Sequence, residues 1–368
     1  MEVIAWGANS HGQLGLGSQS ELELDRRLTG LPKILTTRIK LVSAGGGHTL
    51  MLDSQRKLWA CGWNNKFQLG IGSSADSSQF VKVKCKQRFI KVSCGWDCSA
   101  AITKRCRELY VWGSNSHQQL GIAKEIKVVS KPTKLQTYGL VSDVQFGLRH
   151  TVILNYSGEV LILGSRKHFE QYEHRITVEH SVEVFHLITR CSAAQISCGQ
   201  NHIMVLLQDS SIQCFGDNKY KQCSAVESKN KILKIASGWT HNAFLTLDHK
   251  LFLFGRNNYG QLGNGTRIDA ETPQQCCISP VDDFELGAEH GILKSNGEVY
   301  TWGWNEHGNC GKGGFEDVLI PKKLSLSTRN DERLASIVAG SGYCAATFKT
   351  WPLTYESACA DGEESDSD

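Results

Sequence analysis

The stretch that decides the fold is Trp6–Gly17, which reads WGANSHGQLGLG. Its opening Trp-Gly pair returns along the chain in variant form. The glycine of the pair stands at positions 7, 62, 113, 164, 216, 255 and 303. An internal repeat of this kind is typical of solenoids and propellers, in which every repeat is one supersecondary unit. The repeat therefore has to be explained before any single residue is interpreted.

A second motif, G-x-x-H followed by apolar residues, is in phase with the first. It begins at positions 45, 147, 199, 238 and 287, and two further copies carry Cys98 and Tyr343 in place of the histidine. The step from this glycine to the next Trp-Gly glycine is 16 to 18 residues, for example from 45 to 62. Two apolar runs with a polar turn between them fill each step, as expected for a β-hairpin.

Two more strand-like runs precede each G-x-x-H motif, so that each repeat contains about four short strands, as in one blade of a propeller. The last motif, at Gly340, has no Trp-Gly after it, and the first Trp-Gly has no G-x-x-H before it. If Val3–Trp6 pairs with the strand that follows Gly340, these two incomplete motifs form one blade. The ring is then closed, and no open sheet edge remains. We therefore predict an all-β fold, a seven-bladed β-propeller of four-stranded blades over residues 1–355, closed by the N-terminal strand. An acidic, disordered tail is expected at 356–368.

Composition excludes several classes of function. The formal net charge of the 368 residues is +3, too small to indicate a nucleic-acid partner. The 14 cysteines include no CxxC pair and no cluster with zinc-ligand spacing, so we expect free thiols, no metal and no cofactor. Because Met1–Val3 leads at once into strand-like sequence, we expect no signal peptide, and no apolar run reaches the about 18 residues of a membrane helix. We expect a monomer in the cytoplasm or the nucleus, without membrane insertion.

A residue that is present in every blade cannot mark a unique site. We interpret the repeated glycines, the histidines and the Asn9- and Gln13-type amides as structural groups that satisfy turns and neighbouring polar atoms. Trp6, Trp112 and Trp302 are expected to pack between blades. Function is expected where blades differ, at the two central positions of G-x-x-H and in one Trp-Gly loop. The candidate partner-binding residues are Trp96, Asp97, Arg149, Asn201, Trp239, Thr240, Glu289, Trp304, Asn305 and Glu306.

Two interpretations of these residues are open. Tryptophan and arginine often anchor protein interfaces, which favours a protein-binding surface. The alternative is that these are ordinary loop residues, with Trp96 and Trp239 covering the mouth of the central channel. No P-loop, dinucleotide-binding fingerprint or nucleophile–base pair accompanies them, so we predict a regulator or binding protein and not a bond-making enzyme.

The in-phase pairing of W-G-x-N-x-x-G-Q-L-G with G-x-x-H resembles the regulator of chromosome condensation repeat family over residues 1 to about 350. The resemblance implies a guanine nucleotide exchange factor that binds a small GTPase or a secretory-pathway protein through one face of the ring. It also implies that acidic residues at this part of the repeat contact the GTPase, which carries over to Asp97 and Glu289. Trp304–Glu306 lies in the other class of loop. Exchange requires different affinities for two states of the GTPase and no catalytic group.

Departures from the family pattern leave an alternative function open. The family's chromosome-bound exchange factor has a β-wedge inserted in one blade and a basic tail for chromatin. We identify no such insertion here, and the chain starts directly in a strand. The alternative is therefore a protein-interaction scaffold without exchange activity, and chromatin binding is not expected. The fourth Trp-Gly unit, Leu163–Glu170, lacks Gln-Leu-Gly and opens the longest gap between motifs, so we expect an irregular blade that holds a partner loop or has drifted.

Overall fold

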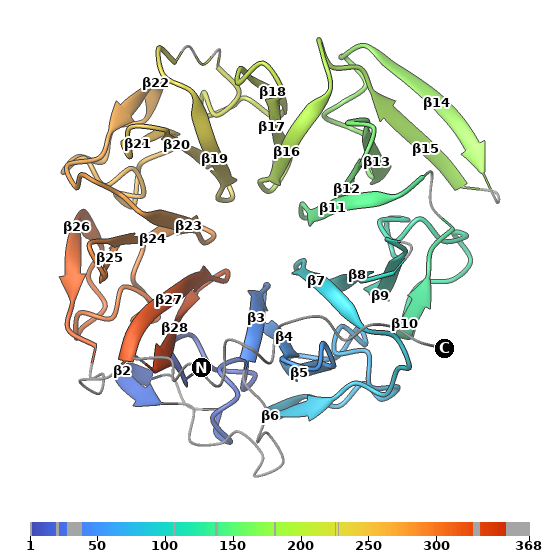
Figure 1. The fold of residues 1–368 in the computed structure, drawn as a ribbon, viewed down its shortest axis with the longest axis horizontal. Helices are drawn as coiled ribbons and strands as arrows, with labels where there is room; N and C mark the ends of the chain where they lie inside the picture. The colour runs from blue at the N-terminus through green and yellow to red at the C-terminus, as the bar shows by residue number, and fades with distance from the viewer. Residues whose placement is uncertain are drawn as a thin grey trace.

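The strands form antiparallel β-sheets arranged radially around a central axis (Figure 1). The computed structural model describes residues 2–19, 22–27, 39–105, 107–136, 139–179, 182–224, 226, 228–326 and 332–350, and within them there are seven sheets. In each sheet the strand that precedes the G-x-x-H loop lies nearest the axis, and the other strands lie towards the rim (Figure 1). The predicted all-β, seven-bladed propeller is confirmed. The expected boundary at 355 and the acidic tail lie outside the described residues.

The first six blades follow one another along the chain. Blade 1 contains β3 (Ile39–Ala44), β4 (His48–Asp53), β5 (Leu58–Gly62) and β6 (Ser77–Lys82). Blade 2 contains β7 (Phe89–Cys94), β8 (Cys98–Thr103), β9 (Leu109–Ser114) and β10 (Val128–Lys134). Blade 3 contains β11 (Val141–Phe146), β12 (His150–Asn155), β13 (Val160–Gly164), β14 (His174–Glu179) and β15 (Val182–Leu187). Blade 4 contains β16 (Ala193–Cys198), β17 (His202–Leu207) and β18 (Ile212–Gly216). Blade 5 contains β19 (Ile232–Ser237), β20 (His241–Thr246), β21 (Leu251–Gly255) and β22 (Ala270–Gln275). Blade 6 contains β23 (Asp283–Leu286), β24 (His290–Ser295), β25 (Glu298–Gly303) and β26 (Val318–Leu324).

Blade 7 closes the ring with strands from both ends of the described chain. From axis to rim it contains β27 (Glu332–Ala339), β28 (Tyr343–Thr350), β1 (Glu2–Gly7) and β2 (Leu22–Arg27). β1 pairs with β28 in antiparallel register from Glu2 opposite Phe348 to Gly7 opposite Tyr343. The predicted closure by the N-terminal strand is confirmed, and β2 supplies the outer strand of the same blade.

Two neighbouring blades depart from the four-stranded pattern. Blade 3 has five strands, in the order β11-β12-β13-β15-β14, and the described part of blade 4 has three. The irregularity expected after Leu163 is therefore confirmed. The sequence analysis identified no inserted β-element, whereas the structure has an additional strand, β14, in blade 3. Without a Gln-Leu-Gly turn at this point, the chain forms the β14–β15 hairpin, whose second strand then pairs with β13.

The repeated amides organise the Trp-Gly loops, as predicted. Asn64 Oδ1 accepts from the backbone N–H of Leu69 at 2.9 Å, and its Nδ2 donates to the carbonyl of Ala75 at 2.9 Å. Gln68 Oε1 accepts from the N–H of Lys66 at 2.8 Å. The equivalent bond to an N–H five residues on is made by Asn9, Asn115, Asn218, Asn257 and Asn305. Each amide replaces the backbone partners that an irregular loop lacks.

The repeated tryptophans pack between blades, as predicted. Each of the three side chains has no exposed surface. Trp6 Nε1 in blade 7 donates to the carbonyl of Asn309 in blade 6 at 2.9 Å, and Trp112 Nε1 in blade 2 donates to the carbonyl of Gln68 in blade 1 at 2.8 Å. Trp302 makes the same bond from blade 6 to blade 5. A hydrogen bond and a large buried ring therefore connect neighbouring blades.

The repeated histidines are buried and neutral. His48 Nε2 lies 2.8 Å from Ser99 Oγ, and His202 Nε2 lies 2.8 Å from Asn242 Oδ1, each in the following blade. Burial lowers the pKa of His48, His150 and His241 to about 3. The predicted structural hydrogen bond is confirmed for His48, for His202 and for His290, whose Nε2 lies 3.2 Å from Cys344 Sγ. For His241 the prediction was wrong, because neither ring nitrogen has a hydrogen-bond partner among the described residues.

The loops of both motifs lie at one end of the ring. In every antiparallel blade the G-x-x-H loop joins the first and second strands, and the Trp-Gly loop follows the third, so that both meet at the same end. The backbone shows this contact directly, because Trp63 N–H donates to the Gly47 carbonyl at 2.7 Å and Trp304 N–H donates to the Glu289 carbonyl at 2.9 Å. We call this end the motif face. All ten candidate residues belong to its loops.

Candidate partner-binding face

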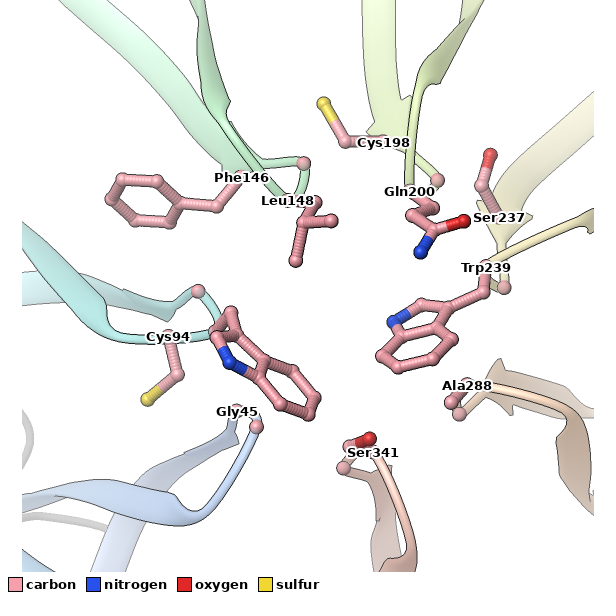
Figure 2. A pocket seen from close by; sticks show the side chains of 18 of the residues that line it. Gly45, Cys94, Phe146, Leu148, Cys198, Gln200, Ser237, Trp239, Ala288 and Ser341 are labelled. Atoms are coloured by element: carbon pink, nitrogen blue, oxygen red, sulfur yellow. The ribbon is translucent and has the colours of Figure 1, made fainter. Parts of the chain in front are cut away.

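The first variable positions of the seven G-x-x-H loops converge on the axis (Figure 2). In this view the side chains of Leu148, Gln200 and Trp239 point towards the channel. The rings of Trp96 and Trp239 approach to 5.4 Å between centroids, at an interplanar angle of 52°. Backbone bonds join the loops around the axis, such as Gln200 N–H to the Trp239 carbonyl at 3.0 Å.

The two tryptophans cover the channel mouth, as the alternative interpretation expected. The cavity left between the loops has a volume of about 120 Å³, below the roughly 300–1,000 Å³ of ordinary small-molecule pockets. Trp96 and Trp239 are each half-buried, so part of each ring remains at the surface. The arrangement suits contact with a macromolecule better than enclosure of a substrate.

Asp97 follows Trp96 in the chain and carries its carboxylate towards Ser114, at the start of a Trp-Gly loop. The side chain is half-buried, and burial raises its pKa, while contact with the Ser114 hydroxyl and the charge of Lys66 lower it. Arg149, at the same loop position in the next blade, is exposed. Its positive charge contributes, after burial, to a lowered pKa of His117. Blades 2 and 3 therefore present a carboxylate and a guanidinium group in neighbouring loops of the motif face.

Glu289 was expected to be a contact acid, but it is buried, with a side chain only 8% exposed. Thr240 Oγ1 donates to its carboxylate at 2.8 Å and Gln261 Nε2 donates at 2.6 Å. Arg256 Nη1 lies 3.6 Å away. Burial raises the pKa of Glu289, and the Thr240 hydrogen bond and the Arg256 charge lower it. The Thr240 hydroxyl thus holds the Glu289 carboxylate close to the Arg256 guanidinium.

The remaining candidates also divide into buried and accessible residues. Asn305 is buried and makes the loop hydrogen bonds of the repeated asparagines, with its Oδ1 accepting from Cys310 N–H at 2.8 Å. Glu306 is exposed, and Trp304 is half-buried with its ring edge-on to His307 at 5.1 Å. Asn201 is half-buried, and its carbonyl accepts from a Trp-Gly loop. Accessibility therefore separates the candidates, although sequence position had grouped them.

Comparison with known proteins places the chain in a family. The family model described as RCC1-like domain matches residues 2–346. The chain belongs to the RCC1-like domain family. The secretion-regulating guanine nucleotide exchange factor of Bos taurus is 30% identical to it over 370 residues, covering 88% of this chain and 78% of the relative. The factor of the same name from Mus musculus is 27% identical, covering 94% and 83%.

Solved structures agree on the fold. Prp20p from Saccharomyces cerevisiae superposes with a TM-score of 0.83 at 21% identity, covering 98% of this chain and 94% of that one. The resemblance drawn from the repeat motifs is confirmed. This RCC1-like chain is a guanine nucleotide exchange factor-like propeller, and relatives from cattle, mouse and Saccharomyces cerevisiae are named as guanine nucleotide exchange factors.

The RCC1-like motif face also contains residues that the sequence analysis missed. Arg256 lies over the rings of Tyr220 and Tyr259, at 4.8 Å and 5.5 Å from their centroids. Trp63 stacks on His11 at 5.1 Å. Arg256 and Trp63 each directly follow a Trp-Gly-type glycine, where blades also differ. The sequence signal for Arg256 and Trp63 was the variation between blades at the residue after the Trp-Gly glycine. The sequence analysis considered that position only at Trp304.

Other kinds of site receive no support from the described part of the RCC1-like chain. It contains no group of three or more His, Cys, Asp or Glu side chains that could hold a metal ion. Its repeated histidines are neutral and distributed around the ring. No helix in the described residues is long and apolar enough to cross a membrane.

Proposed function

We propose that this protein is a guanine nucleotide exchange factor that binds a small GTPase through its motif face, with Trp96, Asp97, Arg149 and Trp239 at the centre of the contact. The observation that carries the proposal is that the half-buried Asp97 directly follows Trp96, whose half-buried ring meets that of Trp239, at positions where the blades differ. Charged groups and aromatic rings at a partly desolvated centre are the usual anchors of protein interfaces. The names of the bovine and mouse relatives support exchange as the activity and secretion as its setting.

Trp304, Glu306 and Arg256 extend the proposed contact outwards. Thr240, Glu289 and Asn305 support the loops from below, since their side chains are buried. Asn201 is half-buried, so its exposure is intermediate between these two groups. We include in the proposal a monomeric protein of the cytoplasm or the nucleus, which sedimentation and cell fractionation would check.

The β14–β15 hairpin supplies an element that could act on a bound GTPase. β15 pairs with β13 only through Phe185–Leu187, so Val182–Val184 extend beyond that pairing towards the motif face. Ile176 and Val178 on β14 are 47% and 66% exposed. A hairpin whose outer strand exposes apolar side chains can contact the GTPase in one nucleotide state more than in another, which is what exchange requires.

The test is release of fluorescent GDP from a panel of purified small GTPases. We expect the wild-type chain to accelerate release from at least one of them and Asp97→Asn to reduce that acceleration about tenfold, because a half-buried interfacial charge is lost. The matched control is Asp248→Asn, which makes the same change in the exposed turn between β20 and β21, at the opposite end of the ring. It should leave the rate unchanged.

The other outcomes separate the alternatives. Asp97-dependent capture of a partner from cells, with no GTPase in the panel responding, would identify a scaffold without exchange activity. Equal loss of exchange in Asp97→Asn and Asp248→Asn would place the contact elsewhere on the propeller. A loss of exchange but not of GTPase binding in Ile176→Ser/Val178→Ser would assign the exchange step to the hairpin.

A further inference from the structure

Blade 4 has an open position where other blades carry their fourth strand. In blades 1, 5 and 6 the third strand pairs with a fourth strand, β6, β22 or β26. In blade 4, β18 pairs with β17, and among the residues that the structure describes no strand lies on its other edge. An unpaired strand edge is a template for a further strand.

Register shows which backbone groups are open. Leu207 N–H donates to the Ser211 carbonyl at 2.9 Å, so that alternate residues, 211, 213 and 215, direct their backbone groups towards β17. Ile212, Cys214 and Gly216 therefore direct their N–H and C=O groups to the open side. The equivalent of Ile212 in blade 1 is Leu58, whose carbonyl accepts from Val83 N–H at 2.9 Å.

Blade 3 covers one end of this edge with a side chain. Tyr172, from the loop before β14, accepts from Gly216 N–H at 3.1 Å and lies with its hydroxyl 3.3 Å from the Gly216 carbonyl, to which it donates. A hydroxyl can do both, and it thus replaces the backbone of a fourth strand at that one residue. The ring is fixed edge-on against Phe215 at 5.1 Å. Among the described residues, no side chain replaces the strand in this way at the backbone of Ile212 and Cys214.

An open groove of about 1180 Å³ runs along this part of the edge. Its floor is apolar, with the buried side chains of Ile212, Phe215 and Ile232. Its lip is basic among the described residues, because Arg190, Lys229 and Lys231 are exposed there and oppose one described carboxylate, that of Asp209.

We infer that the open edge of β18 binds an extended acidic segment of a partner protein by strand addition. The segment would supply the missing outer strand, about six or seven residues long like β6 and β26. Alternate side chains of an added strand point to opposite faces, so apolar residues would face the floor and acidic residues the basic lip. This site is on the outer rim of the ring and is separate from the motif face.

The charge of the lip favours an acidic partner over a second copy of the chain. A second copy would offer the outer strand of one of its blades, such as β14, β6 or β26. β14 contains Arg175, and β6 and β26 contain lysines and no acid, so the basic lip would repel these strands. The two possibilities predict different assemblies, a one-to-one complex in the first case and a self-association in the second.

The test uses the full chain and a fluorescein-labelled nine-residue peptide that alternates valine with glutamate. We expect saturable binding by anisotropy and at least tenfold slower hydrogen exchange of the Ile212 and Cys214 amides. Lys229→Glu/Lys231→Glu should weaken binding at least tenfold. The matched control, Lys84→Glu/Lys86→Glu, reverses two exposed lysines beside the complete blade 1 and should bind like wild type.

Two further peptides keep the test independent of the variants. The same peptide methylated on alternate backbone nitrogens should not bind, because it cannot form the strand hydrogen bonds, and a valine–lysine peptide should bind at least tenfold more weakly. Failure of the valine–glutamate peptide to bind, or binding without protection of Ile212 and Cys214, would overturn the inference. Protection of these amides by a peptide of residues 356–368, or self-association in sedimentation that Ile176→Ser/Val178→Ser abolishes, would replace the partner by the chain's own tail or by a second copy.

Discussion

Replacing Trp6 by phenylalanine tests whether the contact between blades 6 and 7 stabilises the closed ring. Trp6 has no exposed surface, and its Nε1 donates to the Asn309 carbonyl at 2.9 Å. Loss of this bond leaves a buried carbonyl without its donor, at a cost of about 1–3 kcal/mol. The smaller ring leaves a space of about 40 Å³, which adds about 1 kcal/mol at about 24 cal/mol per Å³. The free energy of unfolding should therefore fall by about 2–4 kcal/mol.

Urea unfolding followed by tryptophan fluorescence and circular dichroism measures this change, provided that the slope with denaturant is the same in the variant. The matched control is Trp304→Phe, because Trp304 is half-buried on the motif face and a surface change of this kind costs less than about 1 kcal/mol. A cost below about 0.5 kcal/mol for Trp6→Phe, or equal costs for the two variants, would refute the reasoning.

Two further predictions concern buried polar groups. Burial holds the pKa of His241 at about 3 in the fold, below its ordinary 6.5, so the unfolded chain binds the proton first and stability is lost as pH falls from 6.5 towards 3. His241→Cys, which copies Cys98 of blade 2, should reduce the slope of unfolding free energy by about 1.4 kcal/mol per pH unit in that range, and identical slopes in wild type and variant would contradict this. Glu289→Ala should cost about 3 kcal/mol, because it removes the acceptor of both Thr240 and Gln261. Glu289→Gln keeps an acceptor and should cost less than half as much in urea unfolding, so equal midpoints for the two variants would show that the hydrogen bonds do not matter.

The sequence determined the number of blades and the closure of the ring. Both follow from spacing along the chain, since each blade is made of neighbouring strands and its turn residues recur in phase. The unpaired motifs at Trp6 and Gly340 required β1 to complete the last blade, and β1 does pair with β28. The structural roles of the repeated Asn, Gln and Trp were accessible for the same reason, because a residue needed in every blade acts within a blade or with its nearest neighbour.

The sequence also marked where blades differ, but it could not tell which of those positions are accessible. Asp97 and Glu289 occupy the same position in the repeat, yet Asp97 is half-buried and Glu289 is enclosed by Thr240, Gln261 and Arg256. Their difference comes from side chains in the neighbouring blade, whose size and polarity the repeat does not fix. Arg256 was missed because its position depends on two tyrosine rings from different loops.

Only the tertiary structure decided how the irregular blades are completed and how the axis is covered. Trp96 and Trp239 are 143 positions apart (239 − 96) and meet because the ring brings every first variable position to one point. Tyr172 replaces a strand backbone at Gly216 because the chain departs from the repeat after Leu163. A periodic sequence specifies what is the same in each blade through local contacts. What differs depends on packing between residues far apart in the chain, and no local pattern records it.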